Sequence, residues 1–125
     1  MRFNKKIIAL TIGLLAATSA FADAGKAYVS NQDGGVTVID LTTMETISNI
    51  DIQATGPRGI GITADGKWLV TANKDGNNIS IVDTGTGALV KQVAIGKNPE
   101  FVRVRGYMAY VTYEPSPTTG GAQKP

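Results

Sequence analysis

The 125-residue sequence contains no cysteine and no histidine. Without cysteine, an exported domain has no disulfide bonds and must be held together by its core or by further copies of a repeat. Without histidine, the chain supplies no imidazole base, no Ser-His-Asp triad and no histidine ligand for zinc or haem iron. There is also no nucleophile–base pair, phosphate-binding loop or cofactor fingerprint. The sequence therefore predicts no catalytic, metal-binding or cofactor-binding residue, no cofactor in this chain and no enzymatic activity.

Residues 1–22 have the pattern of a secretory signal peptide. A positively charged start is followed by a short apolar run, residues 7–17, and then by small side chains in Ser19-Ala20-Phe21-Ala22. This pattern predicts cleavage between Ala22 and Asp23. The run is shorter than the roughly 20 apolar residues of a membrane-spanning helix, and no cysteine near the cleavage site could carry a lipid. We expect a bacterial protein that is periplasmic, secreted or at the cell surface, without stable membrane insertion after cleavage.

The sequence has no excess of positive charge once the signal peptide is removed. The full sequence has 12 Lys and Arg residues against 10 Asp and Glu residues. Arg2, Lys5 and Lys6 leave with the signal peptide, so nine basic residues remain against ten acidic ones and the net charge becomes −1. No Lys/Arg cluster compensates for this loss. The balance of charge predicts no nucleic-acid partner.

After residue 25, segments rich in strand-forming residues alternate with clusters of Gly, Asn, Asp and Pro. The strands expected in chain order are residues 26–30, 36–39, 46–52, 58–63, 68–72, 79–82, 88–95, 101–104 and 108–112. No segment shows a helical period. In residues 58–63, glycines alternate with isoleucines and would allow another backbone to approach closely. The sequence therefore predicts an all-β fold.

Three kinds of residue recur at nearly constant spacing. They are Val29, Val70 and Val111, which lie 41 residues apart, Pro57 and Pro99, 42 apart, and Asp40 and Asp83, 43 apart. A period of about 40 to 45 residues with four short strands per unit is typical of a β-propeller blade. We therefore expect a partial β-propeller of about two to two and a half four-stranded blades over residues 23–113.

The repeat resembles that of the YVTN repeat proteins, which are exported bacterial β-propellers related to the haem d1 propeller fold. The strand motif stands as Tyr28-Val29-Ser30-Asn31, as Leu69-Val70-Thr71-Ala72-Asn73 and as Tyr110-Val111-Thr112-Tyr113. The resemblance extends over roughly residues 26–113. Tyr113 departs from the expected asparagine, which makes the third blade the least regular.

A propeller ring closes with about four to eight blades, and this sequence holds one full blade, most of another and the first half of a third. Residues 114–125 carry no fold signal and are expected to form a flexible Pro/Gly-rich tail or a truncated insertion. We therefore expect an N-terminal fragment of a longer protein. The alternative is an assembly of several short chains into one ring.

Four residues are expected to serve turns. Asp40 and Asp83 each end a strand, where a carboxylate accepts backbone N–H groups in a tight turn. Asp65 and Gly66 form the strongest hairpin signal of the chain. Trp68 begins a strand and is expected to pack between sheets, with ligand stacking as the less favoured alternative.

Arg58 and Glu100 are the candidate ligand contacts. Each follows the proline that opens a blade, so the two positions are equivalent yet differ in charge. The propeller resemblance implies that the first strand of a blade lines the central channel and that these residues lie near the channel mouth. The alternative is a pair of solvated loop residues.

The sequence predicts the fold and the cellular compartment more sharply than the function. The favoured function is binding of a protein, a glycan or a small molecule by loops on a rigid ring. The second is a redox propeller that carries a cofactor like haem d1, with ligands from a C-terminal part beyond this sequence. The third is that the 125-residue chain has no function of its own.

Overall fold

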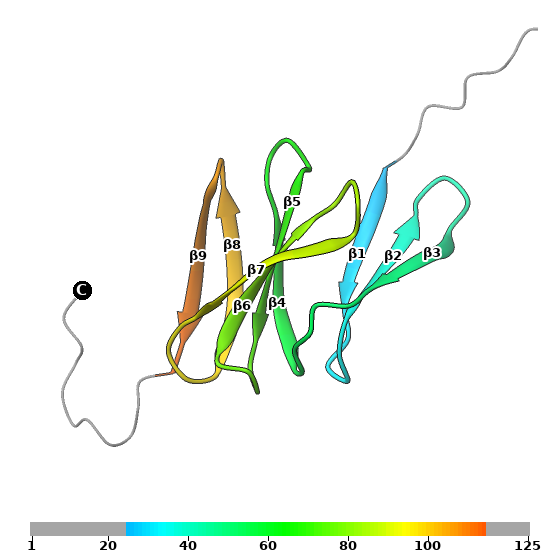
Figure 1. Ribbon diagram of the computed structural model, residues 1–125. Helices are drawn as coiled ribbons and strands as arrows, with labels where there is room; N and C mark the ends of the chain where they lie inside the picture. Colours follow the sequence, from blue (N-terminus) through cyan, green and yellow to red (C-terminus); the bar gives the residue numbers. More distant parts are fainter. Residues whose placement is uncertain (1–24, 115–125) are drawn as a thin grey trace, which may run out of the picture.

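A computed structural model of the chain describes residues 25–114, which form nine β-strands (Figure 1). The predicted signal peptide, its cleavage site between Ala22 and Asp23, and the tail from residue 115 lie outside the described residues. The strands are β1 Lys26–Ser30, β2 Val36–Asp40, β3 Glu45–Ile50, β4 Pro57–Ile62, β5 Trp68–Asn73, β6 Asn78–Asp83, β7 Ala88–Ala94, β8 Pro99–Arg105 and β9 Met108–Tyr113. Within residues 25–114 no helix is found, and so none that could cross a membrane.

The strands form three antiparallel sheets that follow one another along the chain. The first sheet has the order β1-β2-β3, the second β4-β5-β6-β7 and the third β8-β9. We call them blade 1, blade 2 and blade 3. Figure 1 shows them side by side, with blade 2 between the other two. The predicted all-β fold, with one complete blade and two partial ones, is confirmed.

The third predicted strand ends two residues early, at Ile50. The chain turns there because the Asp51 carboxylate accepts the backbone N–H of Gln53 at 2.8 Å and Gln53 adopts a left-handed φ of 51°. Ile52, which was expected inside the strand, is nevertheless fully buried between blades 1 and 2.

The predicted equivalence of Val29 with Val70 is wrong by one residue. In β2, Val38 pairs with Tyr28; in β6, Ile81 pairs with Val70. Val38 and Ile81 hold the same place, two residues before the aspartate that ends each strand. Tyr28 is therefore the structural counterpart of Val70, and a spacing that matched valines by identity missed the shift.

This one-residue shift reverses the side of the sheet to which a side chain points. Val29 points away from blade 2 and is 44% exposed, whereas Val70 is 6% exposed and packs against blade 3. The true counterpart of Val29 is Thr71. The same register makes Asn31 the counterpart of Asn73.

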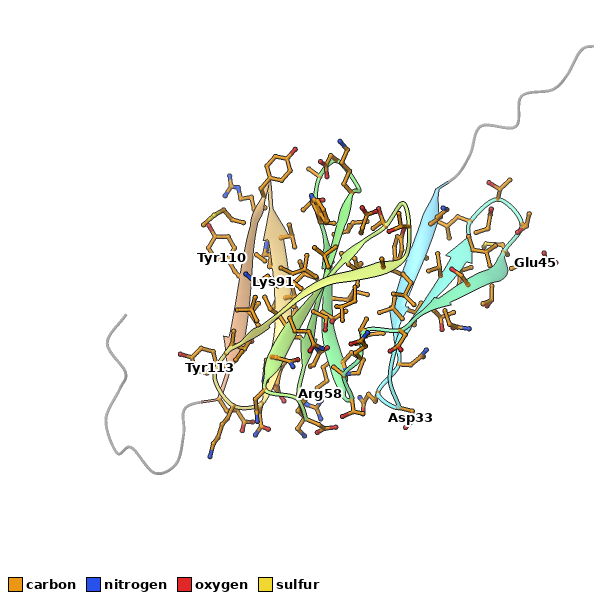
Figure 2. All side chains as sticks on the ribbon, viewed as in Figure 1. Asp33, Glu45, Arg58, Lys91, Tyr110 and Tyr113 are labelled. Atoms are coloured by element: carbon orange, nitrogen blue, oxygen red, sulfur yellow. The ribbon has the colours of Figure 1, made fainter. Side chains whose placement is uncertain are left out.

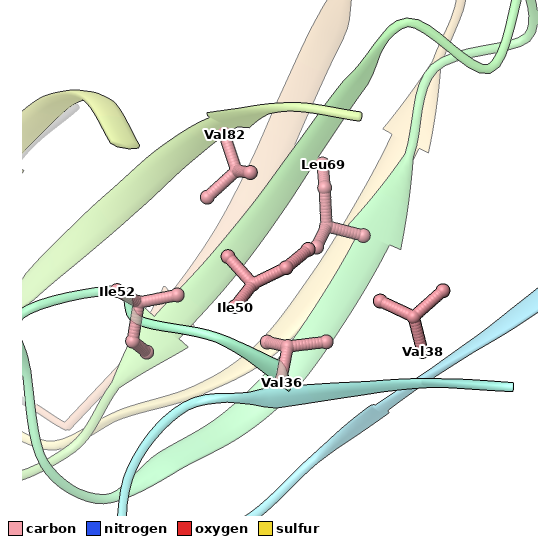
Figure 3. Packing of buried hydrophobic residues seen from close by; sticks show 6 residues of the cluster. All are labelled: Val36, Val38, Ile50, Ile52, Leu69 and Val82. Carbon is pink, nitrogen blue, oxygen red and sulfur yellow. The ribbon is translucent and has the colours of Figure 1, made fainter. Parts of the chain in front are cut away.

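Two hydrophobic clusters join the blades. The first lies between blades 1 and 2 and consists of Val36, Val38, Ile50, Ile52, Leu69 and Val82 (Figure 3). The second lies between blades 2 and 3 and consists of Val70, Ala72 and Val102. Strand β5 is buried on both faces because Leu69 points toward blade 1 and Val70 toward blade 3. Each fully buried aliphatic side chain of this size stabilises the fold by about 1.5–3 kcal/mol.

The glycines of β4 allow close contact with blade 3, as the sequence predicted. A Cβ added at Gly59 would lie 2.7 Å from the backbone nitrogen of Val102. One added at Gly61 would lie 2.8 Å from a methyl carbon of Val104. Strands β4 and β8 thus meet backbone to backbone.

Tyr113 occupies the place of Asn73 in blade 3, because Pro99 pairs with Tyr113 as Pro57 pairs with Asn73. The Tyr113 ring lies over Gly96, where an added Cβ would overlap the ring. The absence of a side chain at residue 96 is what makes room for tyrosine in place of asparagine.

Candidate functional site

The inner strands β4 and β8 begin at the same end of their blades, which we call the proline end. Pro57 and Pro99 stand at the first strand position, where the missing N–H costs no ladder hydrogen bond. Each is preceded by a residue with left-handed backbone, Gly56 with φ 66° and Asn98 with φ 48°. Both strands therefore begin with the same backbone geometry, which places the residue that follows each proline at an equivalent position.

The structure brings the two predicted site residues together at this end. Nη1 of Arg58 donates a hydrogen bond to Oε1 of Glu100 at 2.5 Å, and the pair bridges β4 and β8. The side chains are 37% and 44% exposed. Figure 2 shows Arg58 at the same end of the molecule as Asp33 in the β1–β2 turn. The charged pair thus lies at the surface, where a ligand could reach it.

The ion pair contributes little to holding the blades together. An exposed pair of this kind is worth about 0–1 kcal/mol, whereas Gly59 and the buried Val102 already bring β4 and β8 into contact. The backbone of Arg58 is also held from the other side, since the Ser30 hydroxyl donates to its carbonyl at 3.3 Å. The opposite charges are therefore not required by the packing of the strands beneath them.

An open cavity of about 670 Å³ lies at the proline end between blades 1 and 2. Its wall presents both polar and apolar groups and comes from three separate segments: the β1–β2 turn with Asp33, the linker with Asp51 and Gln53, and the β5–β6 region with Gly76 and Asn78. The sequence did not predict this cavity, because its wall is largely turn and linker backbone.

The turn residues Asp40 and Asp83 accept backbone N–H groups. Oδ1 of Asp40 accepts from Thr42 at 2.7 Å and from Thr43 at 3.1 Å. Oδ1 of Asp83 accepts the N–H groups at the same offsets, at 2.8 and 3.2 Å. The hydrogen bonds from Thr43 and Thr42 lower the pKa of Asp40 because they favour its charged form.

Asp65 and Gly66 lie at the opposite end, in the β4–β5 turn, where Gly66 has φ 72°. The Asp65 carboxylate accepts hydrogen bonds from the Thr63 hydroxyl at 2.6 Å, the Lys67 N–H at 3.1 Å and the Tyr107 hydroxyl at 3.1 Å. The Thr63 and Lys67 bonds lower the pKa of Asp65 most, and the Tyr107 bond adds to them. In return, Asp65 raises the pKa of Tyr107. Asp65 is thus both a turn residue and a link between blades 2 and 3.

Trp68 faces blade 3, as Val70 does, and lines a largely apolar cavity of about 270 Å³ between blades 2 and 3. Val104 and Tyr107 form the opposite wall. In residues 25–114 no group of three or more acidic side chains is arranged to hold a metal ion.

Three adjoining antiparallel sheets pack face to face, and the chain passes from the outermost strand of one sheet into the innermost strand of the next. This arrangement defines a β-propeller. The chain belongs to the cytochrome D1 heme domain family, whose sequence model matches residues 4–109. No curated protein matches the sequence.

Solved structures agree with the propeller fold. Kuenenia stuttgartiensis hydrazine synthase is similar with a TM-score of 0.69 and 26% identity, over 73% of this chain and 26% of that chain. A protein of unknown function from Desulfotomaculum acetoxidans DSM 771 has a TM-score of 0.63 and 23% identity, over 72% of this chain and 32% of that chain. The β-propeller domain of Myceliophteria thermophila Cps50 (Swd1) has a TM-score of 0.56 and 18% identity, over 62% of this chain and 24% of that chain. The chain thus matches about a quarter to a third of each of these proteins.

The proline end of the described chain does not fit a haem site. Haem iron is ligated by His, Cys, Met or Tyr, and the sequence lacks the first two. Met44 and Met108 lie at the end opposite Arg58 and Glu100, in the β2–β3 turn and at the start of β9. The Tyr113 ring, at the proline end, is packed over Gly96. We therefore assign no haem ligand at the proline end of residues 25–114.

Proposed function

We propose that the chain is part of an exported β-propeller that binds a ligand at its proline end. The observation that carries this proposal is the Arg58–Glu100 pair, which places opposite charges on adjacent inner strands at the surface. The pair adds little to blade packing, so a contact to a ligand is a physical reason for its presence. The ligand is a protein, a glycan or a small molecule, and the role is binding rather than catalysis.

The open cavity beside the linker extends the proposed site. Its wall offers the carboxylates of Asp33 and Asp51 and the amide of Asn78. Together with the Arg58–Glu100 pair, these groups suit a ligand that is rich in hydroxyl or amide groups.

The test is a ligand screen against the exported chain, on a glycan array and with a small-molecule library in a thermal-shift assay. We expect ligands found in the screen to bind at least tenfold more weakly to Arg58→Ala and Glu100→Ala. Lys67→Ala, an exposed cation at the opposite end, is the matched control and should bind normally. Ligands that are lost in the control but retained by the two variants would place the site elsewhere.

Export is proposed from the first 22 residues alone. Mass spectrometry of the exported product is expected to give a chain that begins at Asp23. A product that keeps Met1 and stays in the membrane fraction would show that the segment is an anchor instead.

A cofactor-carrying redox propeller is the second candidate, and the family match favours it. Because the proline end of residues 25–114 offers no fitting ligand, a cofactor bound there would depend on residues outside the described chain. The visible absorption spectrum of the full-length exported protein decides the matter. A Soret band supports the cofactor, and a colourless protein excludes it.

A further inference from the structure

The face of blade 2 that meets blade 3 carries small and aliphatic residues on its two inner strands. Gly59 and Gly61 of β4 pair with Ala72 and Val70 of β5. A Cβ added at Gly59 or at Gly61 would lie 2.7 or 2.8 Å from an atom of blade 3. These four positions therefore leave room for blade 3 and add no charge to the junction between the two blades.

The face of blade 3 that is turned away from blade 2 carries large side chains at the equivalent positions. The matching strand registers make Arg103 the counterpart of Gly61, and Tyr110, which pairs with Arg103, the counterpart of Val70. Phe101, two residues before Arg103, likewise takes the place of a glycine. Phe101 is 59% exposed and Tyr110 is 57% exposed, and Figure 2 shows Tyr110 on the side of blade 3 away from blade 2.

This exchange of residues changes what the face can bind. The backbone contact that β4 makes with β8 cannot be repeated on β8, because Phe101 and Arg103 occupy the space that the two glycines leave empty in blade 2. A group that meets this face must stand further away from the backbone. It must also accommodate positive charge.

A cavity of about 410 Å³ on this side of blade 3 concentrates the charge. Its wall consists of Arg103, Val104, Arg105 and Tyr110. Arg103 and Arg105 are two residues apart on β8, which places their backbones about 7 Å apart. Within the described part of the chain neither guanidinium forms an ion pair, whereas Arg58 at the proline end has Glu100 as its partner. The wall thus holds two like charges that repel each other and no carboxylate to balance them.

The chemistry of the wall selects an anion. A guanidinium group is a planar fork of N–H donors that matches the oxygens of a carboxylate or a phosphate, and its hydrogen bonds to such groups are stronger than those between neutral groups. The Tyr110 hydroxyl adds a further donor. An oxyanion between the two arginines would also remove their mutual repulsion.

We propose that this cavity binds an oxyanion, the phosphate or carboxylate group of a small molecule, between Arg103 and Arg105. The site is separate from the proline end, because Arg105 ends β8 and Glu100 lies at its start. The proposal therefore does not depend on the function proposed for the Arg58–Glu100 pair.

The test is an NMR titration of the purified, ¹⁵N-labelled chain with sodium phosphate and, separately, with sodium acetate, at constant ionic strength set with sodium chloride. The readout is the set of arginine Nε–H signals, since phosphate raises the stability of folded proteins in general and a melting temperature would not be specific. We expect the signals of Arg103 and Arg105 to shift and saturate, and that of Arg58 to stay in place. Saturation by only one of the two salts supports the site and identifies the anionic group, and saturation by both supports a site for either group.

Substitutions at the two arginines give the expected size of the effect. Arg103→Gln and Arg105→Gln should each weaken phosphate binding about tenfold, because each removes a charge-assisted hydrogen bond. Arg103→Lys keeps the charge but loses the planar fork and should also bind more weakly than the wild type. Lys91→Gln removes an exposed cation from β7; it is the matched control and should bind phosphate as the wild type does.

The wild-type titration decides the matter even if a variant fails to fold. Shifts that rise linearly without saturation, or shifts of equal size at Arg58, overturn the proposal. Equal weakening by Lys91→Gln overturns it as well, because binding would then follow the net charge of the chain. Undiminished binding by Arg103→Lys would show attraction to a point charge in place of a guanidinium site, and would also overturn it.

Discussion

Replacing Gly59 by alanine tests the backbone contact between β4 and β8 directly. The new Cβ would lie 2.7, 2.8 and 2.9 Å from backbone atoms of Val102, Glu100 and Phe101. Ordinary contact between such atoms begins near about 3.5 Å, so the two strands must separate by roughly 0.8 Å. No side chain can rotate away to relieve the clash, because all three atoms belong to the backbone. The residue has no left-handed φ, so the cost comes from this contact rather than from backbone strain.

The expected loss is at the upper end of the range for overpacking, about 2–3 kcal/mol. A gap of about 0.5–1 Å also forfeits a quarter to a half of the dispersion attraction between atoms that faced each other across it. For a chain of this size the urea midpoint should fall by about 1–2 M. Trp68 is the only tryptophan and lines the cavity between blades 2 and 3. Its emission should therefore shift to longer wavelength as blade 3 moves away.

Gly85→Ala is the matched control. Gly85 has an ordinary φ, and the one atom near its added Cβ is an Asp83 side-chain oxygen at 3.2 Å. We expect a change within about 0.5 kcal/mol and unaltered Trp68 emission. If Gly59→Ala unfolds at the wild-type urea midpoint with unchanged emission, β4 and β8 do not meet as described.

Three further outcomes are expected. Asn73→Ala should lower the free energy of unfolding by about 1–3 kcal/mol because the buried Thr71 hydroxyl loses its acceptor, and Asn31→Ala, at the exposed counterpart, by clearly less; equal losses in urea titrations would contradict the difference in burial between the two asparagines. The Asp65–Tyr107 contact should stabilise the chain between two limits of pH. It is lost as the pH falls through the lowered pKa of Asp65, below 3.8, and as the pH rises through the raised pKa of Tyr107, above 10.0; Tyr107→Phe should therefore flatten the loss of stability above pH 10 seen in urea midpoints. Leu69→Ala should cost about 2–5 kcal/mol through a cavity between blades 1 and 2, and a smaller loss would place Leu69 outside the core.

The strands could be predicted because local signals agree with the fold. β-Branched residues alternate with polar ones, and Gly, Asn and Asp mark the turns. The strand-opening prolines also aligned the inner strands correctly, since Pro57 and Pro99 each need a position without a ladder hydrogen bond. The error at Val70 arose because valine suits either face of a blade within a ring, so residue identity alone does not show the register. The register is shown by the residue with which each position pairs in the strand that ends in aspartate.

The site was predicted in part. The sequence identifies Arg58 and Glu100 as equivalent positions, but it did not predict that they touch. Their contact follows from the fold, because equivalent positions on successive inner strands are neighbours in a propeller. The hydrogen bonds that the Asn73 and Gln92 amides donate to the Ser80 hydroxyl were missed for a different reason. Asn73, Ser80 and Gln92 are far apart in the sequence, and their shared role appears only when the strand registers bring them onto one face.

Hydrogen exchange of the purified chain, followed by mass spectrometry, tests the central claim that blade 2 is a complete blade packed between two partial ones. Strand β5 is paired along both edges and buried on both faces, whereas β1 and β9 each lie at an edge within residues 25–114. The account predicts that β5 amides exchange slowest and those of β1 and β9 markedly faster. Exchange in β5 as fast as in β1 and β9 would contradict it.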